Sequence, residues 1–332
     1  MKAVIISKKG HIEYKEVQEP KIKKGYVKVK VKAAGLCGSD TQKIFSDKKS
    51  LRLVKTSIWG HEISGVIYET GKEVKNFVKG DKVIVNSLIR NDEDSDITKI
   101  RSLGKDLPGG FADYIVVPYK NLRKIPSNIG FEEAILTDSI AVALHGYHLS
   151  NSPTNKNILI LGDGSLGLIT GLLCLEFNNK VTLIGKNIRN LKLASDFGIT
   201  ALRSDQIKDL QKNYDIIFEI VGRKQDNTLD CSIQCIKPNG QITVLGVFEK
   251  GYYGNILLRE LFYKEGKIVG SNSYGFFNGK SEFDMAINFL KKMKLQFSQL
   301  ITHVLPLKEF KTGLDLIKNK KSSKAIKIVF KP

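Results

Sequence analysis

A glycine-rich segment near the middle of the chain constrains the fold more than any other feature. Residues 162–167 read Gly-Asp-Gly-Ser-Leu-Gly; they follow an apolar run at 158–161 and open a stretch of helical spacing. In this strand-turn-helix context, G-x-G-x-x-G gives a tight turn, close backbone approach to a pyrophosphate and close helix packing. The N–H groups that begin the helix also face phosphate. We therefore predict a dinucleotide site that includes Gly162, Gly164, Ser165, Leu166 and Gly167.

The end of the next predicted strand, residues 180–184, indicates which dinucleotide is bound. An NAD site has an acidic residue here, which holds the ribose 2′-hydroxyl. Residues 185–189 read Gly-Lys-Asn-Ile-Arg and contain no carboxylate. Gly185 leaves room for a 2′-phosphate, which Lys186 and Arg189, on either side of Asn187, can neutralise, so NADP is favoured over NAD. The cofactor site is also expected to include three positions near later strand ends, Gly222, Gly246 and Val247.

Strand and helix patterns alternate through the whole segment around this loop. Expected strands lie at 158–161, 180–184, 215–221, 241–246 and 267–270, and helical patterns lie between them. Another helical pattern, at 131–149, precedes the first of these strands. Alternation of this kind is typical of a parallel, doubly wound α/β sheet.

The N-terminal part of the chain has a different pattern. Valine and lysine alternate at 26–32, and apolar and polar residues alternate again at 81–85, so we expect half-buried antiparallel strands. Glycines separate the short strands as turns, which suits a small barrel. The polar segment 90–108, with an acidic cluster at 92–94, is interpreted as a surface loop or short lobe.

The charge of the chain is strongly positive but diffuse. Lys and Arg number 53 against 34 Asp and Glu, a net charge of +19 in 332 residues. A nucleic-acid binder that uses this charge is one alternative, and it would show steeply salt-dependent affinity. The sequence contains no recognition motif or aromatic–basic interleaving, so we expect no nucleic-acid partner. The charge at most helps to attract an anionic cofactor or substrate.

Three separated segments carry polar residues that a core does not need: 35–40 (Gly-Leu-Cys-Gly-Ser-Asp), 60–65 (Gly-His-Glu-Ile-Ser-Gly) and 131–138 (Phe-Glu-Glu-Ala-Ile-Leu-Thr-Asp). Together with 109–114 (Gly-Gly-Phe-Ala-Asp-Tyr) and the glycine loop, they resemble the zinc-dependent medium-chain alcohol dehydrogenase family. The likeness covers nearly the whole chain. It is strongest to the sorbitol- and threonine-dehydrogenase-like branch, with a looser likeness to ribitol-5-phosphate dehydrogenases.

The resemblance implies one catalytic zinc ion. Cys37 and His61 correspond to two ligands, and the third is a carboxylate, either Asp138 or Glu62. That branch has Glu followed by Pro where this chain has Asp138 and Ser139, which is why Glu62 stays an alternative. Three protein ligands leave a fourth position open, as catalytic zinc requires. No cysteine occurs in 90–108, where many members bind a structural zinc, so none is expected here.

Two further residues have catalytic roles by the same resemblance. Ser39 is expected to pass the alcohol proton outward, and Asp40 is expected to orient His61. Hydride passes directly between the substrate carbon and the nicotinamide. The implied substrate is a secondary alcohol or ketone, most simply a polyol, sugar or sugar phosphate. A zinc-free quinone or enone reductase on the same scaffold is the alternative function.

The implied architecture is α/β, with a GroES-like β-barrel catalytic domain and a Rossmann cofactor domain. The expected boundaries are 1–139 with 273–332 for the catalytic domain and 140–272 for the cofactor domain. Four cysteines without disulfide spacing, a short N-terminal apolar run and no membrane-length apolar stretch predict a cytoplasmic protein with no membrane partner. Exposed edge strands in the cofactor sheet predict a homo-oligomer, a dimer or tetramer.

Overall fold

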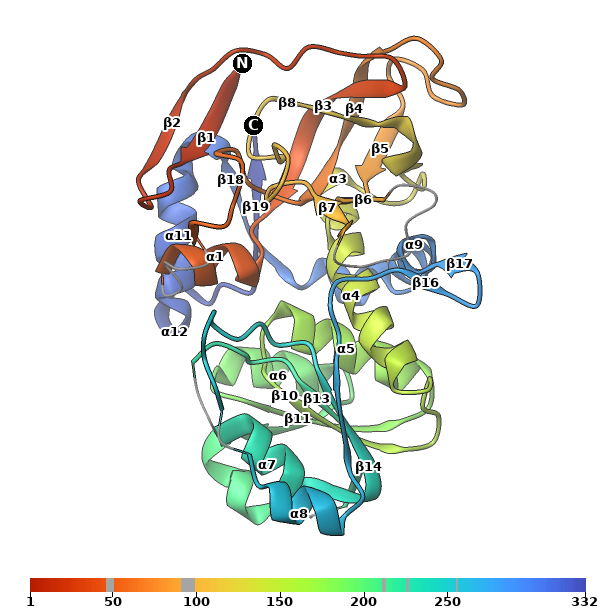
Figure 1. The fold of residues 1–332 in the computed structure, drawn as a ribbon, viewed down its shortest axis with the longest axis vertical. Helices are drawn as coiled ribbons and strands as arrows, with labels where there is room; N and C mark the ends of the chain where they lie inside the picture. The colour runs from red at the N-terminus through yellow and green to blue at the C-terminus, as the bar shows by residue number, and fades with distance from the viewer. Residues whose placement is uncertain (46–50, 91–98, 211–212, 225–226, 255) are drawn as a thin grey trace. The chain divides into compact units, whose positions relative to one another are not determined.

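The computed structural model describes residues 1–45, 51–90, 99–210, 213–224, 227–254 and 256–332. The chain forms two compact units, Met1–Asp138 with Ile287–Pro332, and Ser139–Ala286 (Figure 1). Residues 273–286 thus belong to the second unit, although their expected place was the catalytic domain. The predicted acidic cluster at 92–94 lies outside the described residues. No helix in the described ranges is long and apolar enough to cross a membrane.

The first unit is built on a mainly antiparallel sheet. Within the described part of the chain, the strands at 301–306 and 327–331 are its only parallel neighbours. In spatial order its strands are β18 (Ile301–Pro306), β19 (Lys327–Lys331), β3 (Tyr26–Gly35), β4 (Glu62–Thr70), β5 (Lys82–Val85) and β9 (Leu122–Lys124), with β8 (Tyr114–Pro118) paired to β3. This is the GroES-like barrel implied by the sequence. The C-terminal β19 pairs with β3, so the last residues of the chain complete the N-terminal sheet.

The alternation in β3 places its valines in the core, as predicted. Val27, Val29 and Val31 are buried, whereas Lys30 is exposed. Lys28 departs from the pattern: it is only 9% exposed because Glu19, Glu69 and the ring of Tyr68 surround its amine. Next to these valines, Phe111, Phe310 and Phe330 form an aromatic cluster with ring centroids 4.9–5.8 Å apart, which joins the C-terminal segment to the core.

Shorter elements surround this sheet. The strands are β1 (Lys2–Ile6) with β2 (Ile12–Glu16), and β6 (Leu88–Ile89) with β7 (Arg101–Ser102). The helices are α1 (Gly38–Phe45), α3 (Phe131–Ala134), α10 (Lys294–Ser298), α11 (Phe310–Lys318) and α12 (Lys320–Ser323). Because α1 follows β3 directly, it holds the residues after Gly35 at the end of the sheet.

The second unit contains the predicted parallel sheet. Its strands, in the order found among the described residues, are β12 (Thr200–Arg203), β11 (Lys180–Gly185), β10 (Asn157–Leu161), β13 (Tyr214–Glu219), β14 (Ile236–Val244) and β15 (Lys267–Gly270). Helices α5 (Ser165–Glu176) and α6 (Ile188–Asp196) pack on β10–β12, and α7 (Asn227–Cys235) packs on β13 and β14. The unit also contains α8 (Leu258–Tyr263) and the hairpin of β16 (Phe276–Phe277) and β17 (Lys280–Ser281).

A buried carboxylate explains why residues 273–286 stay with the second unit. Glu282, the first residue of α9 (Glu282–Lys292), lies 2.7 Å from Nδ1 of His148 and 2.8 Å from Nδ1 of His145. Both histidines lie on α4 (Leu136–Leu149), and the N–H of Gly275 also donates to Glu282. The ring of Phe277 stacks on His148 at 3.9 Å. This cluster attaches the segment to α4, a contact that no local pattern indicates.

Candidate zinc and dinucleotide sites

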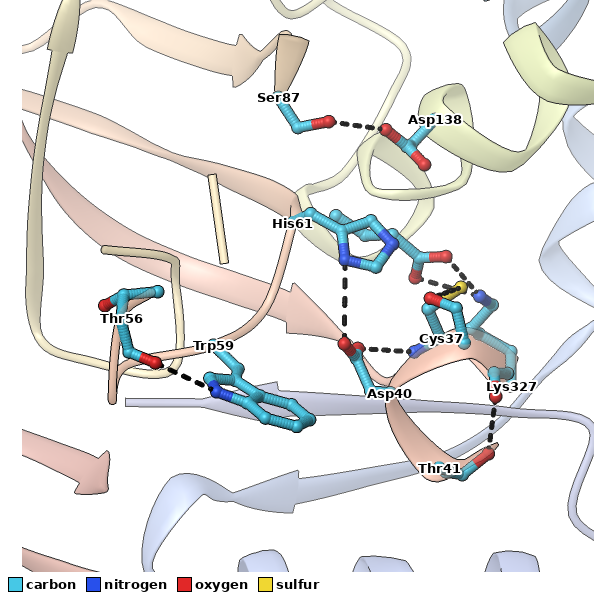
Figure 2. Close-up of polar contacts among 12 residues, drawn as sticks. Cys37, Asp40, Thr41, Thr56, Trp59, His61, Ser87, Asp138 and Lys327 are labelled. Atoms are coloured by element: carbon cyan, nitrogen blue, oxygen red, sulfur yellow. Dashed lines mark hydrogen bonds and ion pairs between the residues drawn. The ribbon is translucent and has the colours of Figure 1, made fainter. Parts of the chain in front are cut away.

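Three candidate metal ligands meet in the first unit. The donor atoms of Cys37, His61 and Glu62 lie within 4.8 Å of one another. Cys37 stands between β3 and α1; His61 lies immediately before β4, and Glu62 is the first residue of β4. Figure 2 shows the side chains of Cys37 and His61 in the same region. Register explains the meeting, because Gly35 pairs with Glu62 across the two strands. A Cβ on Gly35 would lie 2.0 Å from Glu62 Oε2, so glycine at 35 leaves the space that the carboxylate fills.

Asp40 faces the back of the histidine. Its Oδ1 lies 3.8 Å from His61 Nδ1, and the N–H of Cys37 donates to its Oδ2 at 3.4 Å. Burial alone would lower the pKa of His61, but the negative charges of Asp40, Cys37 and Asp138 raise that pKa well above its ordinary value. The negative charges around His61 therefore favour a cation at this place. A bound metal ion would also supply that positive charge.

The predicted relay hydroxyl lies beside the thiol. Ser39 Oγ is 3.4 Å from Cys37 Sγ, on the first turn of α1. Gln42 stands on the same helix and is buried. Proximity to the sulfur places the Ser39 hydroxyl where a group bound at the metal could exchange a proton with it.

The structure separates the two carboxylates that the sequence left as alternatives. Asp138, near the start of α4, accepts a hydrogen bond from Ser87 Oγ at 3.1 Å (Figure 2). It is not among the described acidic, histidine or cysteine side chains that meet within 4.8 Å, whereas Glu62 is. The shorter aspartate side chain thus interacts with a serine, and Glu62 is the carboxylate that lies with Cys37 and His61.

Lys327 is a site residue that the sequence analysis missed. Its Nζ lies 2.6 Å and 2.8 Å from the two oxygens of Glu62, and both side chains are buried. Burial alone would lower the pKa of Lys327, but the charges of Glu62 and Cys37 raise it. The available signal was a lysine inside the otherwise continuous apolar run 325–330, because such a run is typical of a strand that is buried on both faces. Thiolate, imidazole and carboxylate together are a donor set that fits zinc.

The glycine loop has the geometry that its sequence predicts. Gly162 follows β10 with a φ of +123°, and a Cβ on Gly167 would lie 1.9 Å from the carbonyl oxygen of Gly162. Beside Gly164 there is nothing within 4 Å, so this face is open. Ser165 and Leu166 then begin α5, whose N-terminus receives no side-chain cap from Gly164. A turn, an open face, a close packing contact and uncapped N–H groups fit a pyrophosphate.

A carboxylate does lie at the end of β11, contrary to what the local sequence suggested. Asp163, in the glycine loop, accepts hydrogen bonds from the N–H groups of Lys186 at 2.9 Å and Asn187 at 2.6 Å. A Cβ on Gly185 would lie 2.3 Å from the Cβ of Asp163. The prediction that Gly185 leaves room for a 2′-phosphate is therefore wrong, because Asp163 fills that space. Asp163 also anchors the turn that contains Lys186, and Arg189 follows in the first turn of α6.

The three remaining cofactor candidates also meet. Gly222 has a φ of +56°, and a Cβ there would lie 2.5 Å from the N atom of Val247. The N–H of Arg223 donates to the carbonyl of Val247 at 2.7 Å. Gly246 is equally close, since its Cβ would lie 2.4 Å from the N atom of Gly222. The loops that follow β13 and β14 are thus in contact at the carboxyl edge of the sheet, where dinucleotides bind.

Comparison with known proteins matches both units. The family model "Alcohol dehydrogenase GroES-like domain" matches residues 23–127, and "Glucose dehydrogenase C-terminus" matches residues 137–330. Galactitol 1-phosphate 5-dehydrogenase of Escherichia coli is 29% identical over 356 aligned positions, covering 99% of this chain and 100% of that protein. L-idonate 5-dehydrogenase of Vitis vinifera is 26% identical, covering 92% and 87%.

A solved structure agrees over the full length. The crystal structure of galactitol-1-phosphate dehydrogenase from Escherichia coli has a TM-score of 0.88 to this chain at 26% identity, and the match covers 100% of both chains. The named relatives act on CH–OH groups of polyols and related compounds. Fold, motifs and relatives therefore agree over both units.

Proposed function

Because the chain belongs to the zinc-type medium-chain alcohol dehydrogenase family, we propose that it is a zinc-dependent oxidoreductase acting on a secondary alcohol or ketone with NADP(H) as hydride carrier. The observation that carries this proposal is the meeting of Cys37, His61 and Glu62 within 4.8 Å, in a chain that also holds an intact glycine loop. One zinc ion per chain is expected, because residues 90–108 contain no cysteine for a structural site.

The roles of the individual residues follow from their contacts. Cys37, His61 and a carboxylate would hold the zinc ion, which would supply a Lewis acid for the substrate oxygen. Asp40 faces Nδ1 of His61, which leaves Nε2 as the nitrogen available to the metal. Ser39 accepts the alcohol proton and passes it on. Glu62 is the third ligand in this proposal; Lys327 balances its charge when it is not bound to metal.

Two features support a polyol, sugar or sugar phosphate as the substrate. The named relatives include dehydrogenases of galactitol 1-phosphate, L-idonate and sorbitol, which are polyhydroxylated compounds. The net charge of +19 would raise the local concentration of a phosphorylated, anionic substrate. Such steering weakens as ionic strength rises, so the KM for a sugar phosphate should increase with salt more than the KM for an uncharged polyol.

The preference for NADP rests on two cations. Lys186 and Arg189 extend from the turn at the end of β11, and guanidinium and ammonium groups neutralise a 2′-phosphate. Asp163 holds the main chain of this turn by accepting hydrogen bonds from two N–H groups, and these hydrogen bonds partly offset its negative charge. Replacing Lys186 and Arg189 by Ala should weaken NADPH binding at least tenfold and leave NADH binding nearly unchanged. An unchanged NADPH affinity would remove both residues from this role.

Zinc quantification followed by assays tests the whole proposal. We expect about one zinc per purified chain, loss of turnover on chelation and recovery when zinc is restored. NADPH and NADH are then compared against ketoses, ketose phosphates and simple ketones. Less than about half a zinc per chain, with turnover of quinones or enones, would instead support the zinc-free reductase on the same fold.

Location and assembly are predictions of the same proposal. We expect a cytoplasmic enzyme that forms a homo-oligomer. The edge strand β15 and the exposed Leu258, Phe262 and Tyr263 of α8 offer backbone and apolar groups for self-association. Light scattering on the purified protein measures its mass, and Phe262→Glu should shift that mass toward the monomer. A monomeric wild-type protein would contradict this prediction.

A further inference from the structure

A buried carboxyl group lies between the two loops assigned to the cofactor. Glu219 ends β13 and pairs in register with Leu161, the residue before the glycine loop. It is 0% exposed. Its side-chain Oε1 accepts three hydrogen bonds, from the N–H of Val221 at 3.1 Å, the N–H of Gly222 at 3.0 Å and the hydroxyl of Thr228 at 2.9 Å. One oxygen thus orders the loop after β13 and the first turn of α7.

The main chain of the same residue orders the second loop. The carbonyl oxygen of Glu219 accepts the N–H groups of Leu245 and Gly246, each at 2.9 Å. The side chain also lies against this loop, because a Cβ on Gly246 would be 2.4 Å from Oε2 of Glu219. Glu219 therefore contacts both of the crowded glycines, Gly222 and Gly246, that form this part of the predicted cofactor site.

The second carboxyl oxygen has different surroundings. Oε2 is buried and has no hydrogen-bond partner among the described residues. Asp163, Arg223 and Asp230 are charged residues on adjoining segments, and none of them bonds to Glu219. A buried carboxylate without a cation is costly, whereas a neutral carboxyl group is much less so. In agreement, burial raises the pKa of Glu219, although its three donors oppose this rise.

We propose that Glu219 is a positioning residue for the dinucleotide, whose carboxyl group fixes the loops of Gly222 and Gly246. This inference rests on the proposed function. Oε1 accepts the three donors that hold the loop of Gly222 and the start of α7, and Oε2 lies 2.4 Å from where a Cβ on Gly246 would be. A shorter side chain at this position would take the acceptor away from these donors and let the two loops move apart.

Three variants test the proposal. Glu219→Gln keeps the accepting oxygen and the length of the side chain, Glu219→Asp moves the carboxyl group away from Gly222, and the exposed Glu260→Gln is the matched control. The zinc-loaded full-length protein, without substrate, is titrated with NADPH at pH 7, with nicotinamide fluorescence as the readout. Circular dichroism confirms that the variants are folded.

We expect Glu219→Gln and Glu260→Gln to bind within threefold of wild type and Glu219→Asp to bind at least tenfold more weakly. A Gln variant as weak as the Asp variant would show that the accepting oxygen at this distance is not what orders the loops, and it would overturn the proposal. An Asp variant that binds as wild type would also overturn it.

Failure of the proposed cofactor would give a different result. Wild-type protein would then bind neither NADPH nor NADH, whichever residue stood at position 219. If Glu219→Asp does not fold, Thr228→Val takes its place, because it removes one of the three donors to Oε1. We expect it to bind NADPH at least threefold more weakly than wild type, and binding as tight as in wild type would overturn the proposal.

Discussion

The amine of Lys327 lies 2.6 Å and 2.8 Å from the two carboxylate oxygens of Glu62, and the exposed fractions of the two side chains are 2% and 0%. Their strands, β19 and β4, lie on either side of β3 in the barrel sheet. The C-terminal strand thus supplies the positive charge that balances a candidate metal ligand, and the discontinuous first unit is needed for the site as well as for the core.

Removing the lysine amine should destabilise the first unit strongly. Lys327→Met removes the cation beside the buried Glu62 carboxylate, and breaking one half of a buried ion pair costs about 3–5 kcal/mol. Urea denaturation of the zinc-free protein measures the loss without interference from metal binding. Lys331→Met is the matched control on the same strand; its pair with Glu132 is half-exposed, so a loss of at most about 1 kcal/mol is expected. Equal losses in both variants would contradict this account.

Replacing the thiol ligand should separate metal binding from cofactor binding. Cys37→Ser should reduce bound zinc to less than about half an ion per chain, because serine is a poor zinc ligand, and should abolish turnover. NADPH affinity should stay within about twofold of wild type, since the glycine loop belongs to the other unit. Cys231→Ser, in the second unit, controls for loss of a thiol. Loss of NADPH binding in Cys37→Ser would show that the sites are not separate.

Moving the carboxylate at the end of β11 should change the cofactor preference. Gly185→Asp alone places its Cβ 2.3 Å from the Cβ of Asp163, so we expect a loss of stability of about 1–3 kcal/mol. Adding Asp163→Gly removes the clash and leaves the acid where NAD enzymes hold the ribose. The double variant should regain stability and shift the NADH/NADPH affinity ratio about tenfold toward NADH. A Gly185→Asp variant as stable as wild type would show that Asp163 does not fill the space beside position 185.

The stability contributed by Glu282 should depend on pH in the acid range. Burial alone would raise the pKa of Glu282, but hydrogen bonds with His145, His148 and Gly275 outweigh it and lower that pKa to about 2. Because the unfolded value is about 4.3, the stabilisation is complete above that value and is lost as pH falls toward 2. Glu282→Gln should therefore cost about 3 kcal/mol at pH 7.

The cost should shrink steadily as wild type and Glu282→Gln are compared at pH 5, 4 and 3, because wild-type Glu282 becomes protonated in the unfolded chain and then in the folded one. Denaturant unfolding at each pH measures the difference. Glu260→Gln, at an exposed position, should show none. A constant difference across this range would mean that Glu282 acts by packing rather than by its charge.

Local sequence predicted the elements whose conformation depends on neighbouring residues. The strand, turn and helix around Gly162–Gly167 and the alternating strand β3 are found near their expected bounds, and the helical pattern at 131–149 is found as two successive helices, α3 and α4. Spacing of apolar residues and glycine conformation act over a few residues, so they can be read directly. The family resemblance supplied Cys37, His61 and both alternatives for the third ligand.

Tertiary structure decided which charged groups meet. Asp163 with residues 186 and 187, Glu282 with His145 and His148, and Lys327 with Glu62 are separated by 23 to 265 positions, and none shares a local motif. Such pairs form because strand register and helix packing bring the groups into the same dry space, where each needs a partner of opposite charge or a hydrogen bond. Sequence alone thus determined the fold class and the candidate ligands, whereas the packed core determined the partner of each buried charge.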